Sequence, residues 1–322
     1  MRKNNDNLKI IAIVIMAILI IAFFVTSIIK DNKNEESYYS PDFTYNEIDY
    51  RRKNNQELVL FVGLDAYTRN NEDSYRNNNL ADTIILLVID NNGKKILPIQ
   101  INRDTMCEYP ILGVGNKLAG NEYGQIALAH SYGDGGIVSL VNVKDAVSEL
   151  LTGININEYL SITMDAVGIV NDEAGGVEVY IKDDFSSIDP SLVKDSYITL
   201  TGNQALTYVR SRMGLDDSSN IARMNRQKEY LKSLYDKSKS LIKDDKDYVA
   251  RTFNAISPYL VANLDIYALS DLTNKVLEYE VLDSIKLNGE IIVDEDGYVQ
   301  NLLDQEELID FCLDTFYEVI KH

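Results

Sequence analysis

Three short apolar segments between residues 57 and 101 constrain the fold more than any other feature of the chain. They read ELVLFVGL, TIILLVI and ILPIQI, and each is a nearly unbroken run of aliphatic side chains. Runs of this length without polar alternation indicate strands that are covered on both faces. The sequence Asp90-Asn91-Asn92-Gly93 predicts a hairpin between the second and the third. A sheet that is buried on both faces needs a layer of helices on each side.

Helical patterns follow these strands. Apolar side chains at three- and four-residue steps predict an amphipathic helix over residues 136–151, and further helices are expected over 202–212 and 221–242. Asp304 with Glu307 resembles a capping box and predicts a last helix to about Ile320. Additional strands are expected over 159–164 and, after the glycine pair Gly175-Gly176, over 177–181. The alternation of strands and helices predicts a three-layer α/β domain.

The N-terminal region has a different composition. Residues 10–29 read IIAIVIMAILIIAFFVTSII, an uncharged stretch of the length that crosses a bilayer as a helix. A cleaved signal peptide would have a shorter apolar region and a small-residue cleavage site, and no such site follows. We therefore expect a tail over residues 1–9, a retained anchor over 10–30, a polar, tyrosine-rich stalk over 31–56 and a catalytic domain over 57–322. The basic residues before the apolar stretch favour a cytoplasmic N-terminus, which places the domain outside the cell membrane.

The charge of the chain excludes several functions. The net charge is -19, and because residues 1–30 carry +3, the remainder carries -22. So acidic a body disfavours nucleic-acid binding and is repelled by anionic lipid headgroups.

His130 and His322 are the only histidines, which disfavours zinc chemistry and a Ser-His-Asp triad. Cys107 and Cys312 are compatible either with one disulfide or with two separate thiols.

Arginines gather in one segment of this acidic chain. The stretch YVRSRMGLDDSSNIARMNRQK contains four of the 11 arginines within 17 positions, namely Arg210, Arg212, Arg223 and Arg226. The guanidinium group is a planar fork that matches two oxygens of one phosphate or carboxylate. The cluster therefore indicates either an anion-binding site or ion pairs with the chain's own carboxylates, for which Asp216 and Asp217 are the nearest candidates.

A helical projection separates these arginines. With a helix beginning at Ile221, Arg223 and Gln227 lie one turn apart at the border of an apolar stripe, whose members are Ile221, Met224, Leu231, Leu234 and Tyr235. Arg226 lies about 160° from the centre of that stripe. We expect Arg223 and Gln227 to line a cleft, whereas Arg226 is equally compatible with a solvated helix face.

Carboxylates lie at the ends of the predicted strands. Asp65 follows the first strand, Asp82 precedes the second and Arg103-Asp104 follows the third. If these strands are neighbours, the side chains converge at one edge of the sheet. Hard carboxylate oxygens beside arginines suit Mg²⁺ and a diphosphate. Each aspartate taken alone is also a common turn residue.

The sequence resembles the LytR-CpsA-Psr proteins of bacterial cell envelopes. The resemblance covers roughly residues 57–242 and rests on seven segments in the family's order: VLFVGLD, ADTIILLVID, INRDT, LAHSYGDGG, DEAGGVEV, GNQALTYVRSR and ARMNRQK. It implies an α-β-α sandwich with a mixed central sheet and a single-pass membrane enzyme of the cell exterior. It also implies transfer of a glycopolymer from a polyprenyl-pyrophosphate carrier onto a peptidoglycan hydroxyl, with the lipid tail in an apolar tunnel.

The resemblance assigns roles to the residues singled out above. Asp65 and Asp82 would hold Mg²⁺, and one of them would help to take the proton of the acceptor. The pyrophosphate would be bound by Arg103, Arg210, Arg212, Arg223 and Gln227, with Arg226 in the same motif. Asp104 lies next to the site and would at most assist.

Two positions depart from the family pattern. The family commonly has arginine two places before the second aspartate and aspartate three places before Arg223, where this chain has Leu80 and Asn220. One charge-assisted contact is worth about 1.5–3 kcal/mol, so the departures are compatible with a weakened site. Two alternatives therefore stay open: a non-catalytic binder of lipid-linked precursors, and a hydrolase of the same pyrophosphates. Direct DNA binding is disfavoured by the acidic body.

Overall fold

The computed structural model describes residues 41–64, 77, 79–211, 214–216, 220–245, 247–287 and 289–320. The predicted tail and anchor, residues 31–40 of the predicted stalk, Asp65 and Arg212 lie outside the described residues. Among the residues that are described, no helix combines the length and the hydropathy needed to cross a membrane.

A seven-stranded mixed sheet forms the centre of the molecule. Its order is β11-β8-β3-β4-β5-β12, and β13 also pairs with β5. The strands are β3 (Gln56–Leu64), β4 (Ala81–Asp90), β5 (Lys95–Ile101), β8 (Glu158–Thr163), β11 (Leu260–Ala262), β12 (Glu280–Val281) and β13 (Ile285–Leu287). β3 and β5 are antiparallel to β4, whereas β8 is parallel to β3 and β12 and β13 are parallel to β5. The three predicted apolar strands are thus adjacent, and the predicted hairpin joins β4 to β5.

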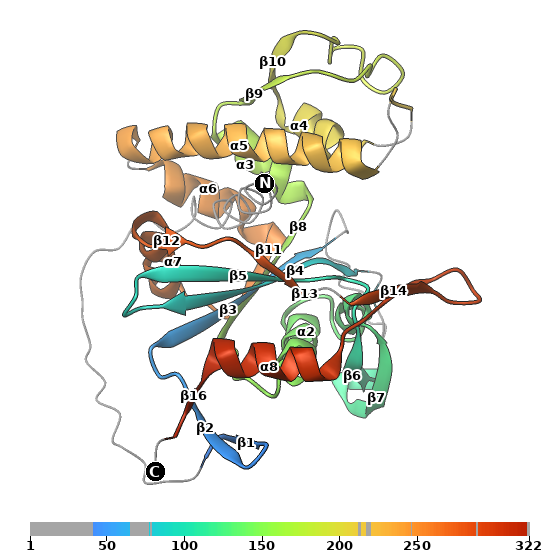
Figure 1. Ribbon diagram of the computed structural model, residues 1–322. Helices are drawn as coiled ribbons and strands as arrows, with labels where there is room; N and C mark the ends of the chain where they lie inside the picture. Colours follow the sequence, from blue (N-terminus) through green and yellow to red (C-terminus); the bar gives the residue numbers. More distant parts are fainter. Residues whose placement is uncertain are drawn as a thin grey trace, which may run out of the picture.

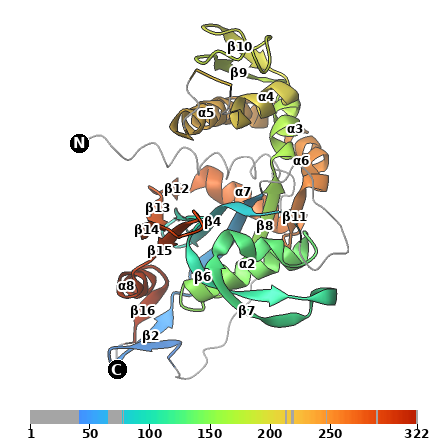
Figure 2. The same ribbon diagram turned by 90° about the vertical axis from the view of Figure 1, so that its right-hand side faces the viewer.

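Both faces of this sheet are buried, as the sequence predicts. Along β3, Val59 and Phe61 belong to one core, and Leu60 and Val62 belong to the other, because successive strand side chains point to opposite faces. The core that contains Val59 and Phe61 is completed by five helices: α3 (Asp165–Glu173), α4 (Gly202–Arg210), α5 (Asn220–Asp244), α6 (Tyr248–Ile256) and α7 (Ile266–Glu278). The core that contains Leu60 and Val62 is completed by α2 (Ile137–Leu150) and α8 (Gln305–Phe316). Figures 1 and 2 show these two layers on either side of the sheet. The mixed α/β architecture is confirmed.

Helix caps follow the sequence signals. At the start of α4 the Thr201 hydroxyl accepts from the Gln204 N–H, and the Gln204 side chain accepts from the Thr201 N–H at 2.9 Å, which makes a capping box. At the start of α8 the Asp304 carboxylate accepts from the Glu307 N–H at 2.9 Å, which is the N-cap half of the predicted capping box. This helix ends at Phe316 and not near Ile320, because the next residues form strand β16 (Tyr317–Val319).

The range expected to be a stalk contains regular structure. β1 (Phe43–Tyr45) and β2 (Ile48–Arg52) form a hairpin, and β16 pairs with β2 in antiparallel register. The Lys53 ammonium adds hydrogen bonds to the carbonyls of Asp314 and Thr315 at 2.7 and 3.1 Å. β1 and β2 are only three and five residues long, so the alternation of their apolar side chains is too short to be recognised as a strand pattern. Residues 41–56 are therefore part of the folded domain rather than a stalk.

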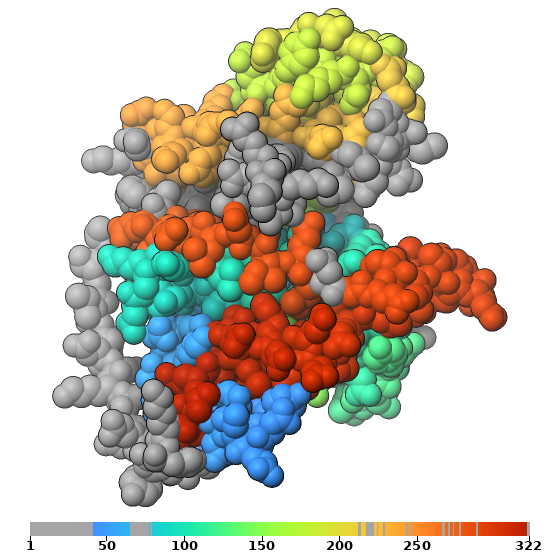
Figure 3. All heavy atoms as spheres, viewed as in Figure 1, coloured from blue at the N-terminus to red at the C-terminus, as the bar shows by residue number. Residues whose placement is uncertain are grey.

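The remaining strands form three hairpins outside the central sheet. They are β6 (Met106–Leu112) with β7 (Leu118–Gln125), β9 (Val177–Tyr180) with β10 (Tyr197–Leu200), and β14 (Glu290–Val293) with β15 (Val299–Leu302). Three 3₁₀ helices, η1 (Val114–Asn116), η2 (Ile126–Ser131) and η3 (Ser257–Tyr259), complete the described elements. The β14–β15 hairpin projects from the body of the molecule at the right of Figure 3.

The two cysteines are separate thiols. Cys107 and Cys312 are both buried and unpaired in the described structure. Burial raises the pKa of each thiol to about 12, so both are protonated and unreactive at neutral pH. Of the two possibilities left open by the sequence, the structure has the separate thiols.

Glu158, the first residue of β8, is a partly buried carboxylate. Burial, assisted by the nearby Glu57 carboxylate, raises its pKa from 4.5 to about 7. The Lys275 ammonium opposes this shift, but it is held at 2.6 Å by both oxygens of Glu57 and at 2.5 Å by Asp271. The native state therefore binds a proton at Glu158 between pH 4.5 and 7 that the unfolded state releases, and stability falls as pH rises through this interval.

Replacing Glu158 by glutamine is expected to remove this pH-dependent loss. At pH 8 the variant should melt about 2–4 °C above the wild-type protein, a modest gain because Glu158 is only partly buried. At pH 4.5 the two proteins should melt alike, since glutamate is then protonated in the native state. Differential scanning calorimetry at both pH values checks this, with the exposed Glu290→Gln as the control; an equal gain at both pH values would contradict it.

Candidate active site

Antiparallel pairing brings three chain segments to one edge of the sheet. Leu64 at the end of β3 pairs with Ala81 at the start of β4, and Ile84 pairs with Ile101 at the end of β5. Asp82 therefore lies at the same edge as the turn that follows β5, which carries Arg103 and Asp104. The β3–β4 register shifts between Gly63 and Leu64, at this edge.

The side chains of Asp82, Arg103 and Asp104 meet there. The Arg103 Nη1 forms an ion pair with the Asp82 Oδ1, and its Nε lies 3.6 Å from the Asp104 Oδ1. The side chains of Arg103, Asp82 and Asp104 are 37%, 39% and 24% exposed. An arginine that is held by carboxylates and still open to solvent can bind an incoming anion. The predicted convergence of these three residues is confirmed.

Hydrogen bonds hold the turn that carries Arg103. The Arg103 carbonyl accepts from the Ala127 N–H at 3.1 Å, and the Asp104 carbonyl accepts from the Asn301 N–H at 2.8 Å. The Asn301 side chain, 1% exposed, also donates to the Thr105 hydroxyl at 2.9 Å. The Gln125 amide donates to the Asp104 carboxylate at 3.1 Å and to the Val299 carbonyl at 2.6 Å. The turn is thus fixed between η2 and β15.

Sequence reasoning missed Asn301 and Gln125 as supports of the site. The Asn301–Thr105 contact joins residues 196 positions apart, and neither amide lies in a motif or a helical period. No local signal in the sequence identifies such a contact, because it depends on how β15 packs beside β6.

A second group of predicted residues lies at the junction of α4 and α5. Arg210 is the last residue of α4, and Arg223 lies in the first turn of α5, where it is half-buried. A hollow of about 320 Å³ lies beside Arg210, and its lining is Ile188, Leu206, Thr207, Arg210 and Ser211. Gln227 is half-buried and donates to the Val209 carbonyl at 3.0 Å. Arg223 and Gln227 are predicted at the border of the apolar stripe of α5, and their half-buried side chains agree with this position.

Arg226 has a different environment from the one the helical projection suggests. It is buried, with 4% of its side chain exposed, and its Nη1 donates to the Asp183 carboxylate at 2.5 Å. The buried face of α5 continues from Arg226 through Tyr230, Leu234 and Ser238 in four-residue steps. The predicted apolar stripe shares only Leu234 with this face, because an arginine, a tyrosine and a serine occupy the other three positions.

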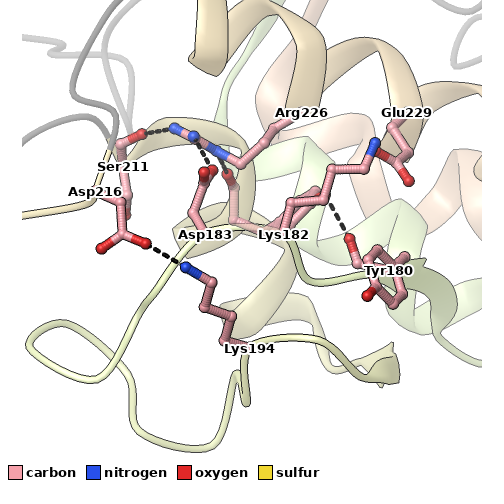
Figure 4. A network of polar contacts seen from close by, with 9 residues as sticks. Tyr180, Lys182, Asp183, Lys194, Ser211, Asp216, Arg226 and Glu229 are labelled. Carbon is pink, nitrogen blue, oxygen red and sulfur yellow. Dashed lines mark hydrogen bonds and ion pairs between the residues drawn. The ribbon is translucent and has the colours of Figure 1, made fainter.

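Asp216 does not serve as the partner of an arginine in the described contacts. Its carboxylate accepts from the Lys194 ammonium at 2.5 Å, and Asp217, the other candidate, lies outside the described residues. Figure 4 shows this ion pair beside the Arg226–Asp183 pair. The partner that Arg226 uses instead, Asp183, is 43 positions away in the chain.

The predicted residues therefore form two groups on one side of the molecule. The sheet-edge group is Asp82, Arg103 and Asp104; the junction group is Arg210, Arg223, Arg226 and Gln227. In Figure 1 the α4–α5 junction lies in the upper layer on the right, above the side of the sheet where β4 begins. Asp65 and Arg212, the other predicted members, lie outside the described residues.

The donor chemistry of the sheet-edge group fits Mg²⁺. This ion is commonly bound through one or two carboxylates together with substrate phosphates, and the Asp82 carboxylate is accessible for such a role. Within the described ranges, no three or more His, Cys, Asp or Glu side chains are grouped so that they could hold a metal ion. A metal at this site would therefore need the substrate phosphates, or Asp65, to complete its coordination.

Fold and site together define a layered α/β protein with arginines and carboxylates exposed on the side where its central strands end. Comparison with known families agrees with this description. The chain belongs to the LytR_cpsA_psr family, whose sequence pattern matches residues 21–311.

The relatives in this family include enzymes named polyisoprenyl-teichoic acid–peptidoglycan teichoic acid transferases. TagT of Bacillus subtilis is 28% identical over 244 residues, which cover 72% of this chain and 67% of TagT. TagV of the same organism is 28% identical over 192 residues, which cover 56% of this chain and 44% of TagV. The match thus spans less than half of one relative and about two thirds of the other.

Solved structures share the fold. The crystal structure of B. subtilis TagV has a TM-score of 0.55 at 22% identity and covers 82% of this chain and 98% of its own. A structure described as TagT bound to LI-WTA has a TM-score of 0.53 at 24% identity and covers 81% of this chain and 90% of its own. These similarities support the mixed α/β fold described above.

Proposed function

We propose that this protein is a membrane-anchored phosphotransferase that moves a glycopolymer from a polyprenyl-pyrophosphate carrier onto a hydroxyl group of peptidoglycan. The observation that carries the proposal is the solvent-accessible Arg103–Asp82 ion pair at the sheet edge, in a chain that belongs to this family. The names of the curated relatives supply the donor and acceptor classes. The glycopolymer itself stays open.

The arginines would bind the diphosphate. Arg103 lies at the sheet edge, and Arg210 and Arg223 lie at the α4–α5 junction. Arg212 follows Arg210 by two positions in the chain. Their forks would stabilise the charge that grows on the transferring phosphoryl group and on the leaving phosphate. The Gln227 amide, which holds the Val209 carbonyl, would support Arg210 and have one further N–H for the ligand.

The reaction would exchange the phosphoanhydride bond of the carrier pyrophosphate for a phosphate ester to the acceptor. The acceptor oxygen forms a bond to the phosphorus next to the sugar, and the bond from that phosphorus to the bridging oxygen breaks, so that polyprenyl phosphate leaves. The acceptor proton would pass to a carboxylate, Asp65 or Asp82. Asp82 and Asp65 would hold Mg²⁺, which would supply additional stabilisation of the negative charge on the phosphates.

Placement at the membrane belongs to the proposal. The apolar residues 10–30 would anchor the chain with its N-terminus in the cytoplasm, and the folded domain, which begins near Pro41, would stand outside. Because a lipid-linked donor is itself held in the bilayer, the anchor would keep the site and the donor at the same surface.

Leu80 gives a specific reason to keep a second candidate. It stands where the family commonly has arginine, two residues before Asp82, so this chain has one cation fewer at the sheet edge. A domain that holds lipid-linked precursors without turning them over would tolerate this loss more readily than an enzyme. The second candidate is therefore a non-catalytic binder.

A transfer assay with the full chain tests the proposal. The protein in detergent is incubated with a lipid-linked glycan diphosphate, Mg²⁺ and peptidoglycan, and covalent attachment of the glycan and release of polyprenyl phosphate are measured. The proposal predicts both products in equal amounts. Release of glycan phosphate without attachment would indicate a hydrolase instead, and binding of the donor without either product would indicate the binder.

A further inference from the structure

The C-terminal turn of α4 is held by side chains of α5. The last carbonyls of a helix have no partner within the helix and must be satisfied from outside. Here the Arg226 Nε donates to the Tyr208 carbonyl at 3.3 Å, and its Nη2 donates to the Ser211 carbonyl. Gln227 donates to the Val209 carbonyl that lies between them in the chain. These bonds hold the backbone on both sides of Arg210, one of the residues that line the 320 Å³ hollow.

The charge of Arg226 is compensated within the protein. Its third donor group, Nη1, binds Asp183, whose side chain is 16% exposed, and its guanidinium carbon lies 5.8 Å from the centre of the Phe185 ring. The same ring stacks on Tyr208 at 5.8 Å. Figure 4 shows the guanidinium between Asp183 and Ser211, and only 4% of the Arg226 side chain is exposed. A guanidinium with this surrounding is placed to hold other groups rather than to bind a ligand itself.

We propose that Arg226 and Asp183 form a positioning pair that aligns Arg210 for diphosphate binding. This inference rests on the proposed function, because it takes the diphosphate as the ligand of Arg210. Arg226 then acts through the backbone on both sides of Arg210, and Asp183 fixes the direction of its fork. Arg226, which the sequence motif groups with the ligand-binding residues, therefore supports Arg210 and does not contact the ligand itself.

The geometry requires arginine at this position. Its planar fork reaches two carbonyls and one carboxylate at the same time, whereas an ammonium is a point charge with three donors on a flexible stem. Arg226→Lys keeps the charge opposite Asp183, so the buried pair survives and the variant should fold. It loses the fixed link between the carbonyls of Tyr208 and Ser211.

A double-mutant cycle on affinity tests the inference. Binding of farnesyl diphosphate, a short soluble polyprenyl diphosphate, is measured by calorimetry with Mg²⁺ for the full chain, Arg226→Lys, Arg210→Ala and the double variant. We expect each single variant to weaken binding about tenfold, the loss of roughly one charge-assisted contact. If Arg226 acts through Arg210, the double variant should bind no more weakly than Arg210→Ala.

The exposed pair Lys182–Glu229 provides the control. Lys182 also approaches α5, from the residue next to Asp183, but its side chain is 64% exposed. Lys182→Gln should leave the affinity unchanged. Losses that multiply in the double variant, or an Arg210→Ala variant that binds like wild type, would overturn the inference.

Hydrogen exchange separates this inference from the proposed function. The amides of Arg210 and Ser211 should exchange faster in Arg226→Lys than in wild type, with or without ligand, and should be unchanged in Lys182→Gln. If the wild-type chain does not bind farnesyl diphosphate, the proposed function fails. Exchange then decides the structural part: unchanged amides in Arg226→Lys would overturn the positioning role, and faster exchange would support it.

Discussion

Arg103→Ala is expected to lower the rate of glycan transfer about 10²–10³-fold, the usual effect of removing one preorganised donor from an active site. Arg103 is the described arginine of the sheet edge, where its Nη1 pairs with Asp82 while 37% of its side chain stays exposed. Alanine removes the donor and leaves the turn intact, because that turn is held through the backbone of residues 103 and 104. Initial rates with saturating lipid-linked donor measure the effect.

A matched control is available on the other side of the protein. Arg51 forms an exposed ion pair with Glu318, and its side chain is 63% exposed. Arg51→Ala should transfer at the wild-type rate, and both variants should melt close to the wild type because surface pairs contribute little. An Arg103→Ala variant that retains full activity would remove the sheet edge from the site.

Asp82→Asn is expected to lower transfer about 10²-fold or more and to raise the Mg²⁺ concentration needed for half of the remaining activity. The amide keeps the size of the side chain but removes the charge that would hold the metal and that orients Arg103. The test is a series of Mg²⁺ titrations of the transfer rate.

The control for this series is Asp236→Asn, which removes an exposed carboxylate paired with Lys232 on α5. It should change neither the rate nor the Mg²⁺ requirement. If Asp82→Asn lowers the rate with an unchanged Mg²⁺ requirement, Asp82 orients Arg103 without holding the metal. A wild-type rate in Asp82→Asn would contradict both roles.

The parts of the fold that the sequence predicts are those with a local signal. The apolar runs of β3, β4 and β5 indicate strands buried on both faces, and they lie side by side in the sheet. The convergence of Asp82 with Arg103 follows from the same signal, because two hairpin-connected strands return to one edge. Asp304 marks the beginning of α8 through its own capping chemistry.

The parts that the sequence does not predict depend on distant partners. Arg226 is buried because Asp183 neutralises it, and no pattern within α5 encodes that partner. The strands β1 and β2 are short, and β2 pairs with β16 at the other end of the chain, a partner that residues 41–56 do not encode. The same reason hides Asn301, whose two contacts to the Arg103 turn exist only after the hairpin β14–β15 has docked.

In the proposed function, arginines from the sheet edge and from the α4–α5 junction bind one lipid diphosphate. Structure determination of the full chain in complex with a polyprenyl diphosphate and Mg²⁺ tests it most directly. We expect phosphate oxygens within hydrogen-bonding distance of Arg103 and of at least one of Arg210 and Arg223, with the metal beside Asp82. A diphosphate bound elsewhere, or one that contacts neither group of arginines, would contradict it.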